Sequence, residues 1–339
     1  MPDANILIWL PSPMGDAILC TPAIKAVRDH FNCSRISFFA EPVVRDVLSP
    51  TTFNDQWLLR ENKSLIAAVK KLYPCKFTHA LLFKNSFSSA LAAFLARIPV
   101  RVGYVRQGRA GLLTHKLYPE KLADGRFKPL SMIDYYLAVA RTLGADCSGR
   151  DLELSVDPDA ADTLTAKIPE TCRPQSPVVV IVPGGAFGPS KCWPSQRFAK
   201  TADWLTENYN ATVIVSVSPH SREQQIADTI CSTARRTVIN AAARNLSIAE
   251  LKALFSLADL VISNDTGPRH IAIALRRKVI TLFGPNDHAW TETGCENEIK
   301  IIGSADCAPC AKGVCSKETN LCMLSITVEM VCDAVKKFL

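Results

Sequence analysis

Three short turns contain the residues of this chain that are best suited to chemistry, and each turn directly follows a run of apolar residues. They are Gly15-Asp16, the stretch from Gly184-Gly185 to Ser190-Lys191, and Asp265-Thr266-Gly267 with His270 one helical turn further on. Glycines let backbone N–H groups approach an anion, a lysine adds a positive charge, and free N–H groups at a helix start attract phosphate. The second and third turns therefore indicate a phosphate-containing ligand, and the Asp16 carboxylate could accept a proton.

Each turn also has a simpler explanation. Asp16 and Asp265 could be helix N-caps without a ligand, and a lone histidine such as His270 is more often structural than catalytic. The stretch from Gly184 to Lys191 could be an ordinary strand-to-helix connection, because its spacing matches neither a Walker A loop nor a dinucleotide-binding Gly-x-Gly-x-x-Gly. The presence of three such turns in one chain favours a functional site.

Apolar runs that alternate with helical patterns surround these turns and predict an α/β fold with parallel, doubly wound sheets. Strands are expected over residues 5–10, 36–39, 57–59, 80–83, 100–104, 178–182, 211–217, 260–262, 279–283 and 298–302. Helices are expected over residues 17–31, 65–72, 88–96, 130–143, 196–208, 221–233, 247–255, 270–275 and 327–339. The ligand of such a sheet lies at the carboxyl ends of the strands, which is where the three turns fall.

The chain is long enough for two domains. Residues 1–168 are expected to form an N-terminal Rossmann-like domain, and residues 177–324 a second one after a Pro-rich linker. Residues 325–339 are expected to form a closing helix that could pack back on the first domain. Asp157-Pro158-Asp159 superficially resembles a metal-binding Asp-x-Asp motif, but we interpret it as a helix start just before the linker.

The composition narrows the range of partners. The 339 residues are 48% hydrophobic and 21% charged, as in a globular protein with a large core, and the net charge is +7. This charge is too small to indicate nucleic acid and is compatible with an acidic substrate. No signal peptide and no transmembrane run is recognisable, so a cytosolic location is expected.

Thirteen cysteines are scattered over the chain, and this odd number fits reduced thiols better than a disulfide framework. Four of them lie within sixteen residues and could bind one structural zinc ion: Cys307, Cys310, Cys315 and Cys322. The wide spacing of the second pair favours structural thiols, with zinc as the second option.

Taken together, the turns resemble those of the ADP-heptose:lipopolysaccharide heptosyltransferases, glycosyltransferase family nine. The resemblance is carried by Met14-Gly15-Asp16, Pro183-Gly184, Phe187-Gly188-Pro189-Ser190-Lys191, Trp193-Pro194, Asn264-Asp265-Thr266-Gly267-Pro268 with His270, and Phe283-Gly284-Pro285. The segments Asn85-Ser86-Phe87, Ile98-Pro99, Gly103-Tyr104 and Gly111-Leu112-Leu113 look like the heptosyltransferase II branch. The chain departs from the family pattern at Cys192, where arginine is usual, and at Arg269, where an apolar residue is usual.

The resemblance implies a GT-B fold, in which two Rossmann-like domains face a cleft, and an inverting transfer of heptose from ADP-heptose to the inner core of lipopolysaccharide. The N-terminal domain would bind the acceptor, the C-terminal domain would bind the nucleotide-sugar, and transfer would need no metal or other cofactor. Asp16 would be the general base. The donor would contact Gly184, Gly185, Ser190, Lys191, Asp265, Thr266, Gly267 and His270. Its ribose is expected to contact Glu223, because this residue follows the strand that contains Val213 and Val217. The acceptor would contact Asn85, Ser86, Arg101, Arg106 and Arg109, in a basic stretch that also contains Arg97 and could equally be a solvated surface.

Two other functions fit the same residues. A nucleotide-sugar epimerase or hydrolase of similar build would convert the donor without an acceptor. A non-catalytic nucleotide-binding protein would bind ADP tightly and turn nothing over. The expected location is the cytoplasm, with peripheral attachment to the inner membrane, where the acceptor lies, as a further option.

Overall fold

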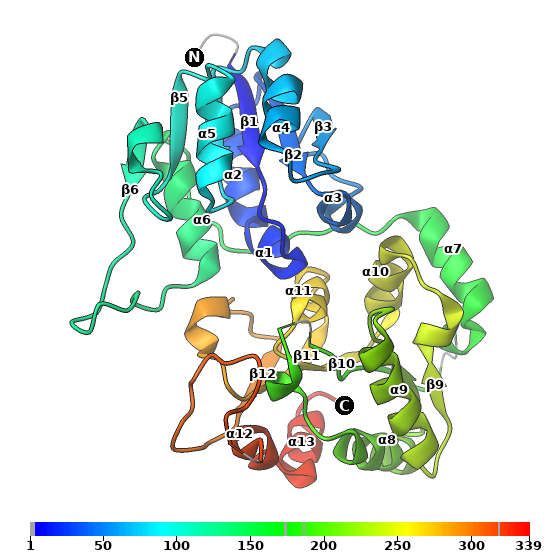
Figure 1. Cartoon of the computed structure of the whole chain (residues 1–339). Helices are drawn as coiled ribbons and strands as arrows, with labels where there is room; N and C mark the ends of the chain where they lie inside the picture. The colour runs from blue at the N-terminus through cyan, green and yellow to red at the C-terminus, as the bar shows by residue number, and fades with distance from the viewer. Residues whose placement is uncertain (1–3, 173–174, 186, 318) are drawn as a thin grey trace. The chain divides into compact units, whose positions relative to one another are not determined.

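The computed structural model describes residues 4–172, 175–185, 187–317 and 319–339, and the chain divides into two compact α/β units (Figure 1). Unit 1 comprises Met1–Ser155 and Ala289–Thr293, and unit 2 comprises Val156–His288 and Gly294–Leu339. The division therefore precedes residue 156 and not residue 169, where the Pro-rich linker was predicted. The helix capped by Asp157, which accepts a hydrogen bond from the Asp159 N–H, consequently belongs to unit 2.

Six parallel strands form the sheet of unit 1 in the order β3-β2-β1-β4-β5-β6. The strands are β1 (Asn5–Trp9), β2 (Arg35–Ala40), β3 (Gln56–Leu59), β4 (His79–Leu82), β5 (Val100–Tyr104) and β6 (His115–Leu117). The helices are α1 (Met14–Leu19), α2 (Thr21–His30), α3 (Pro42–Leu48), α4 (Leu65–Leu72), α5 (Phe87–Leu95) and α6 (Met132–Arg141), with 3₁₀ turns η1 (Tyr73–Cys75) and η2 (Ala110–Leu112). The five strands predicted here are confirmed, whereas α3 and β6 were not predicted.

The single helix predicted over residues 17–31 is two helices, α1 and α2, which are separated at Cys20. Pro22 has no backbone N–H to donate to the carbonyl of Ile18, and the hydroxyl of Thr21 donates to that carbonyl instead (2.8 Å). Asp16 therefore lies in the first turn of a short helix that follows β1.

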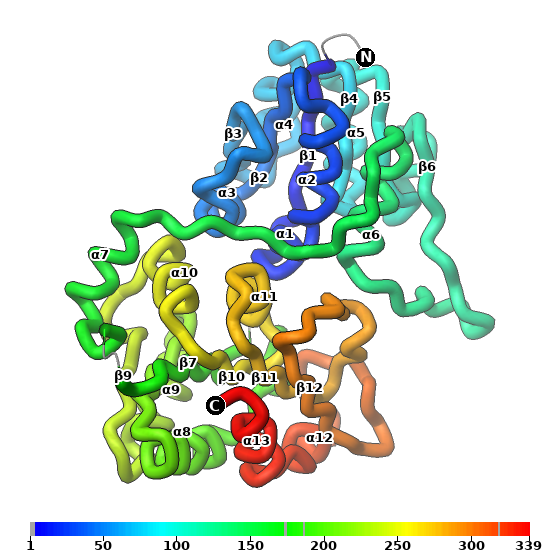
Figure 2. Tube along the Cα trace, turned by 180° about the vertical axis from the view of Figure 1, so that it is seen from behind, coloured from blue at the N-terminus to red at the C-terminus, as the bar shows by residue number. Residues whose placement is uncertain are grey.

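Helices cover both faces of the first sheet. α4 and α5 pack side by side on one face (Figure 1), and α2 and α6 pack side by side on the other (Figure 2). Strand residues such as Leu7 and Trp9 are fully or almost fully buried against Leu72 of α4 and Ala93 of α5. This double covering is why the strands read as nearly continuous apolar runs.

Unit 2 also contains six parallel strands, in the order β12-β11-β10-β7-β8-β9. The strands are β7 (Val178–Val182), β8 (Thr212–Val215), β9 (Val238–Asn240), β10 (Leu260–Asn264), β11 (Lys278–Phe283) and β12 (Glu298–Ile302). The helices are α7 (Pro158–Lys167), α8 (Ser195–Tyr209), α9 (Ser221–Thr233), α10 (Ile248–Leu257), α11 (Gly267–Ala274), α12 (Leu321–Leu324) and α13 (Val328–Val335). Shorter 3₁₀ turns are η3 (Pro169–Cys172), η4 (Pro189–Lys191), η5 (Ala241–Arg244) and η6 (His288–Thr291).

The closing helix α13 packs on α8, β11 and β12, so its apolar side completes the core of unit 2. Val331 and Val335 of α13 join Phe198 of α8 and Ile280 of β11 in one buried cluster. The prediction of a helix near the C-terminus is confirmed, but the structure places this helix within unit 2. Within the described residues, no helix has both the length and the hydropathy needed to cross a bilayer.

The strand order determines where the polar turns lie along the carboxyl edge of each sheet. The winding direction reverses between β1 and β4 in unit 1 and between β7 and β10 in unit 2. Loops that leave neighbouring strands on either side of such a reversal run in opposite directions and leave a crevice at the carboxyl edge of the sheet. Asp16 follows β1, Gly184 follows β7 and Asp265 follows β10, so each predicted turn lies at a reversal point.

Candidate functional site

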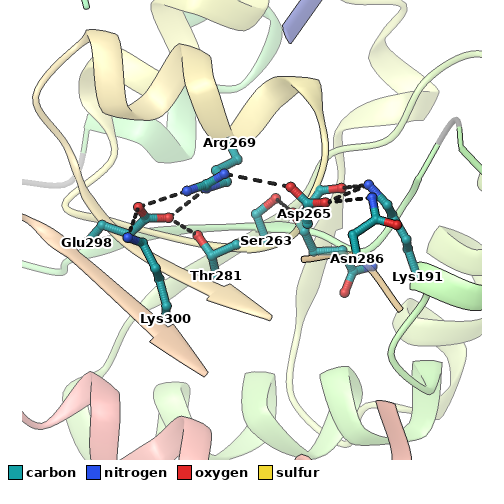
Figure 3. Close-up of polar contacts among 9 residues, drawn as sticks. Lys191, Ser263, Asp265, Arg269, Thr281, Asn286, Glu298 and Lys300 are labelled. Atoms are coloured by element: carbon teal, nitrogen blue, oxygen red, sulfur yellow. Dashed lines mark hydrogen bonds and ion pairs between the residues drawn. The ribbon is translucent and has the colours of Figure 1, made fainter. Parts of the chain in front are cut away.

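The two turns of unit 2 meet through a buried ion pair between Lys191 and Asp265 (Figure 3). Lys191 ends η4, which follows β7, and Asp265 follows β10, which is paired with β7. The Lys191 ammonium donates to Asp265 Oδ2 (2.6 Å) and to the Asp265 backbone carbonyl (3.0 Å). Lys191 is 8% exposed and Asp265 5% exposed. The structure thus brings together two residues that are 74 positions apart in the sequence.

The surroundings keep Asp265 ionised. Burial by itself would raise the pKa of Asp265, but the positive charges of Lys191 and Arg269 outweigh burial and lower this pKa below its usual value. Asn286 Nδ2 also lies 3.3 Å from Asp265 Oδ2. Lys191 makes two hydrogen bonds to described residues, and both end on Asp265, so one of its three N–H donors remains for a ligand.

The predicted residues on the following helix lie beside this ion pair. Thr266 is the N-cap residue of α11 but makes no side-chain cap hydrogen bond, and Gly267 is the first helical residue. His270 is 3% exposed, and burial together with the charge of Arg269 lowers its pKa to about 3. The imidazole is therefore neutral at physiological pH. Its Nδ1 atom is buried without a hydrogen-bond partner among the described residues.

Gly184 and Gly185 lie against the carboxylate of Glu223, in the first turn of α9. Glu223 Oε1 accepts from the Gly185 N–H (3.0 Å), and Oε2 accepts from the Ser218 N–H (3.0 Å). A Cβ atom on Gly184 would lie 2.5 Å from Glu223 Oε2, so any larger residue there would displace this carboxylate. Asn264 Nδ2 donates to the carbonyl of Pro183 (2.6 Å) and ties the end of β10 to this turn.

Ser190 joins the same turn to the cysteine-rich segment. Its N–H donates to the carbonyl of Gly313 (3.2 Å), and its hydroxyl donates to the carbonyl of Lys312 (2.5 Å). Asn320 Nδ2 in turn donates to the Ser190 carbonyl (2.7 Å). The Ser190 hydroxyl is therefore engaged in holding the segment in place, which sequence reasoning did not anticipate.

The four cysteines of this segment are free thiols in the structure, as are the other nine. Cys322 is buried, whereas Cys307 is exposed. Among residues 4–172, 175–185, 187–317 and 319–339, no three His, Cys, Asp or Glu side chains are arranged to hold a metal ion. The structure thus gives no support to the optional zinc site at Cys307, Cys310, Cys315 and Cys322.

In unit 1, the Asp16 carboxylate is half-buried in α1. Burial raises its pKa from 3.8 to about 6. The helix start would by itself favour the ionised form, but α1 is only one and a half turns long and desolvation outweighs its dipole. A pKa near 6 still leaves the carboxylate ionised above pH 7, and it suits a general base better than the usual value does.

The predicted acceptor-binding arginines differ in their surroundings. Arg109 is fully buried, and its guanidinium donates to the carbonyls of Tyr104 (2.8 Å) and Lys84 (2.6 Å) and to Asn85 Oδ1 (2.9 Å). Arg101 donates to the carbonyls of Leu112 (2.6 Å) and Pro99 (3.2 Å). Both side chains therefore bind backbone carbonyls of their own unit, and the full burial of Arg109 shows that this residue does not belong to a solvated surface.

The remaining acceptor-side residues are more accessible. Arg106 is half-buried and lies 4.3 Å above the ring of Phe127, and Arg97 is exposed. Asn85 Oδ1 accepts from Arg109 and from the Tyr135 hydroxyl (3.1 Å). Ser86 caps α5 by accepting from the Ser89 N–H (3.1 Å). Arg97 is thus the exposed arginine of these four, Arg101 and Arg106 are half-buried, and Arg109 is fully buried.

Sequence reasoning missed a polar cluster at the carboxyl edge of the first sheet. Glu41 Oε1 accepts from the Ser12 hydroxyl (2.8 Å) and from Lys84 Nζ (3.1 Å), and Arg60 Nη1 lies 3.5 Å away. Burial would raise the pKa of Glu41, but Ser12, Lys84 and Arg60 lower it overall. Each of these residues lies one to three positions beyond the end of a predicted or observed strand, and that position was the signal that could have identified them.

The comparisons with known proteins agree with this arrangement. The model of glycosyltransferase family 9 (heptosyltransferase) matches residues 65–320. Lipopolysaccharide heptosyltransferase 2 of Salmonella typhimurium is 28% identical over 305 residues, which are 85% of this chain and 84% of that protein. Lipooligosaccharide heptosyltransferase 2 of Campylobacter jejuni is 23% identical and covers 98% of both chains.

A solved structure shows the same architecture. The chain aligns with the structure of E. coli ADP-heptose lps heptosyltransferase II with a TM-score of 0.79 and 22% identity, over 98% of both chains. This likeness confirms the expected GT-B fold with two doubly wound units. Because the family model matches three quarters of the sequence, the chain belongs to glycosyltransferase family 9, the heptosyltransferase family.

Proposed function

We propose that this glycosyltransferase moves a heptose from ADP-heptose to the inner core of lipopolysaccharide with inversion at the anomeric carbon. The observation that carries the proposal is the Lys191–Asp265 ion pair at the reversal point of the second sheet, in a chain of this family. The names of the relatives supply the substrate class: those proteins are lipopolysaccharide or lipooligosaccharide heptosyltransferases.

Unit 2 would bind the donor. The diphosphate would take the remaining Lys191 donor and the free N–H groups at the start of α11, near Thr266 and Gly267. Asp265 would accept hydrogen bonds from sugar hydroxyls, and the neutral His270 would offer a nitrogen to the same ligand. Glu223, which stands against Gly184 and Gly185, would reach the ribose.

The reaction would break the bond between the anomeric carbon and the diphosphate and form one to an acceptor hydroxyl. Asp16 would take the proton of that hydroxyl as the new bond forms. ADP would leave with the bonding electron pair, and Lys191 with the backbone N–H groups would stabilise its charge. No step of this scheme needs a metal ion, because the cationic side chain and the helix start supply the positive field.

Transfer is tested by mass spectrometry of heptose-deficient core acceptors incubated with ADP-heptose and the purified chain. A mass increase of one heptose on the acceptor, together with release of ADP, is the expected result. Reactions without acceptor are the control, because an epimerase or hydrolase of similar build would consume the donor there. ADP binding without turnover under any of these conditions would point to the non-catalytic alternative. Family membership disfavours both alternatives.

The same proposal places the chain in the cytoplasm, at the inner membrane where a lipid-linked acceptor would lie. The thirteen free cysteines support a reducing compartment. The outer surface of α4, η1 and α5 supports membrane contact, because exposed apolar side chains lie there among basic ones. The apolar members are Ile66, Tyr73, Phe87, Phe94 and Leu95, and the basic members are Lys63, Lys70, Lys71, Lys76 and Arg97.

This mixture of aromatic, aliphatic and basic side chains is typical of surfaces that rest on anionic lipids. Sedimentation with vesicles that contain phosphatidylglycerol should recover the chain at low salt, and the Ile66→Ser/Phe94→Ser variant should stay in the supernatant. Met330→Ser, which removes an exposed apolar side chain of α13, is the matched control and should sediment like the wild type. A wild-type chain that stays in the supernatant with such vesicles would contradict membrane attachment through this surface.

A further inference from the structure

A second buried ion pair stands directly behind Asp265, and the proposed function does not use it. Arg269 of α11 is fully buried, and its guanidinium meets the carboxylate of Glu298, the first residue of β12 (Figure 3). Arg269 Nε lies 2.6 Å from Glu298 Oε1, and Nη2 lies 2.9 Å from Oε2. The Thr281 hydroxyl also donates to Oε1 (2.5 Å). Two parallel hydrogen bonds of this kind fix the plane of a guanidinium.

Another nitrogen of this guanidinium faces the donor turn. Arg269 Nη1 lies 3.6 Å from Asp265 Oδ1, while Asp265 Oδ2 accepts from Lys191. Each oxygen of the Asp265 carboxylate therefore faces its own cation. Glu298 fixes the position of the Arg269 guanidinium, and the guanidinium in turn restricts the position of the Asp265 carboxylate. The Asp265 carboxylate then restricts the position of the Lys191 ammonium, which binds its other oxygen.

The chemistry of the pair also points to positioning. Burying two charges is costly, and apolar residues of similar volume would pack α11 against β12 at least as well. A planar guanidinium, however, can form two hydrogen bonds to Glu298 and at the same time place its charge 3.6 Å from Asp265, which an ammonium or an apolar side chain cannot do. Packing of α11 against β12 therefore does not explain why an arginine paired with Glu298 lies beside Asp265.

We propose that Arg269, anchored by Glu298, is a positioning residue for the donor diphosphate. Arg269 fixes the carboxylate of Asp265, and Asp265 then holds the Lys191 ammonium so that its remaining N–H is directed to phosphate. This inference rests on the proposed function only in that the ligand of Lys191 is taken to be a nucleoside diphosphate.

A double-mutant cycle separates this role from a structural one. Arg269→Lys keeps the charge that neutralises Glu298 but loses the second edge of the guanidinium. In the wild-type background we expect it to raise the dissociation constant of ADP, measured by calorimetry, and the KM of the donor about tenfold. The acceptor KM and kcat should change less than threefold. In an Asp265→Asn background, the same substitution should change ADP affinity less than twofold, because Arg269 acts through the carboxylate that is already lost.

Asp203→Asn is the matched control within unit 2. Asp203 is 4% exposed and accepts from the N–H groups of Arg235 and Arg236 (both 2.8 Å). Its loss should lower Tm without changing ADP affinity. If Arg269→Lys does not fold, Arg269→Met/Glu298→Met, which removes both charges together, replaces it in both backgrounds and should give the same coupling.

The inference would be overturned if Arg269→Lys left ADP affinity unchanged in the wild-type background. It would also be overturned if the substitution weakened ADP binding by the same factor in the wild-type and the Asp265→Asn backgrounds. A wild-type chain that fails to bind ADP would overturn both this inference and the proposed function. If ADP binds and the cycle couples while no heptose is transferred, the positioning role stands and only the proposed function fails.

Discussion

Replacement of Asp16 by asparagine should abolish turnover and at the same time stabilise unit 1. Asparagine keeps the shape of the side chain but cannot accept the proton of an acceptor hydroxyl. Loss of a general base costs about 10²- to 10⁴-fold in rate. The kcat of Asp16→Asn should therefore fall by at least about a hundredfold, while ADP binding to unit 2 should be unchanged.

The stability change follows from the pKa of Asp16. Burial raises this pKa from 3.8 to about 6, so the folded chain binds the proton more tightly than the unfolded chain does. The stability that this group contributes is therefore greatest below pH 3.8, falls as the pH rises to about 6, and is constant above that value. A shift of about two units corresponds to at most about 3 kcal/mol of destabilisation at neutral pH. Asparagine carries no charge and removes this destabilisation, so the variant should have the higher Tm at pH 7.5.

The pH dependence of the wild-type rate tests the same carboxylate. Acceptor kcat/KM should be flat above pH 7 and should fall about tenfold per pH unit below pH 6, as Asp16 becomes protonated. Transfer rates would be measured by mass spectrometry from pH 5 to pH 8, and Tm by thermal unfolding at pH 7.5. Asp29→Asn, at an exposed position of α2, is the matched control and should leave both quantities unchanged.

Two results would refute this reasoning. Asp16→Asn that transfers heptose at more than a tenth of the wild-type rate would show that Asp16 is not the base, and Asp265 would have to be reconsidered. A lower Tm of the variant at pH 7.5 would show that the carboxylate makes a stabilising contact in the folded chain, contrary to a pKa that is raised by burial alone.

Three further predictions concern the donor turn and the basic stretch. Lys191→Ala should weaken ADP binding by on the order of 2 kcal/mol, about thirtyfold, because a charge-assisted contact is lost; unchanged binding in calorimetry would contradict the assignment. Arg97→Gln/Arg106→Gln should raise the acceptor KM at low salt and remove most of its salt dependence, because these charges would attract an anionic acceptor. A wild-type acceptor KM that is independent of salt would count against this attraction. Gly188→Ala should lower both Tm and ADP affinity, because a Cβ there would lie 2.1 Å from the Gly313 carbonyl oxygen and Gly188 has φ near 150°. A variant with wild-type Tm would show that the cysteine-rich segment can move aside.

Much of the fold follows from local sequence patterns. β7 is a run of five apolar residues, four of them valine, that suits a strand covered on both faces, and all five of its residues are buried. Asp265 and Lys191 could be assigned to phosphate-type turns because the strands before them are clear in the sequence. Asp157 could be identified as a helix cap because its side chain bonds locally, to the N–H of Asp159.

Predictions failed where a competing local bond or a distant segment decided the structure. Pro22 divides the helix predicted over residues 17–31, because it has no N–H to donate to the Ile18 carbonyl and the Thr21 hydroxyl donates there instead. Arg109 looked like an exposed basic residue, yet it is fully buried and donates to backbone carbonyls of its own unit. The direction of the Asp16 pKa shift depends on how deeply the side chain is buried, which its sequence neighbours do not reveal.

The types of the elements, the family motifs and the positions of the three turns could therefore be predicted, because each depends on residues that are neighbours along the chain. Contacts between distant side chains depend instead on how the strands are arranged in the sheet. Lys191 pairs with Asp265, 74 residues away, because β7 and β10 are adjacent in the sheet, and Arg269 meets Glu298 because α11 packs beside β11 and β11 is paired with β12. Strand order, burial and the charge partners of a buried group are properties of the assembled sheet, and no local pattern contains them.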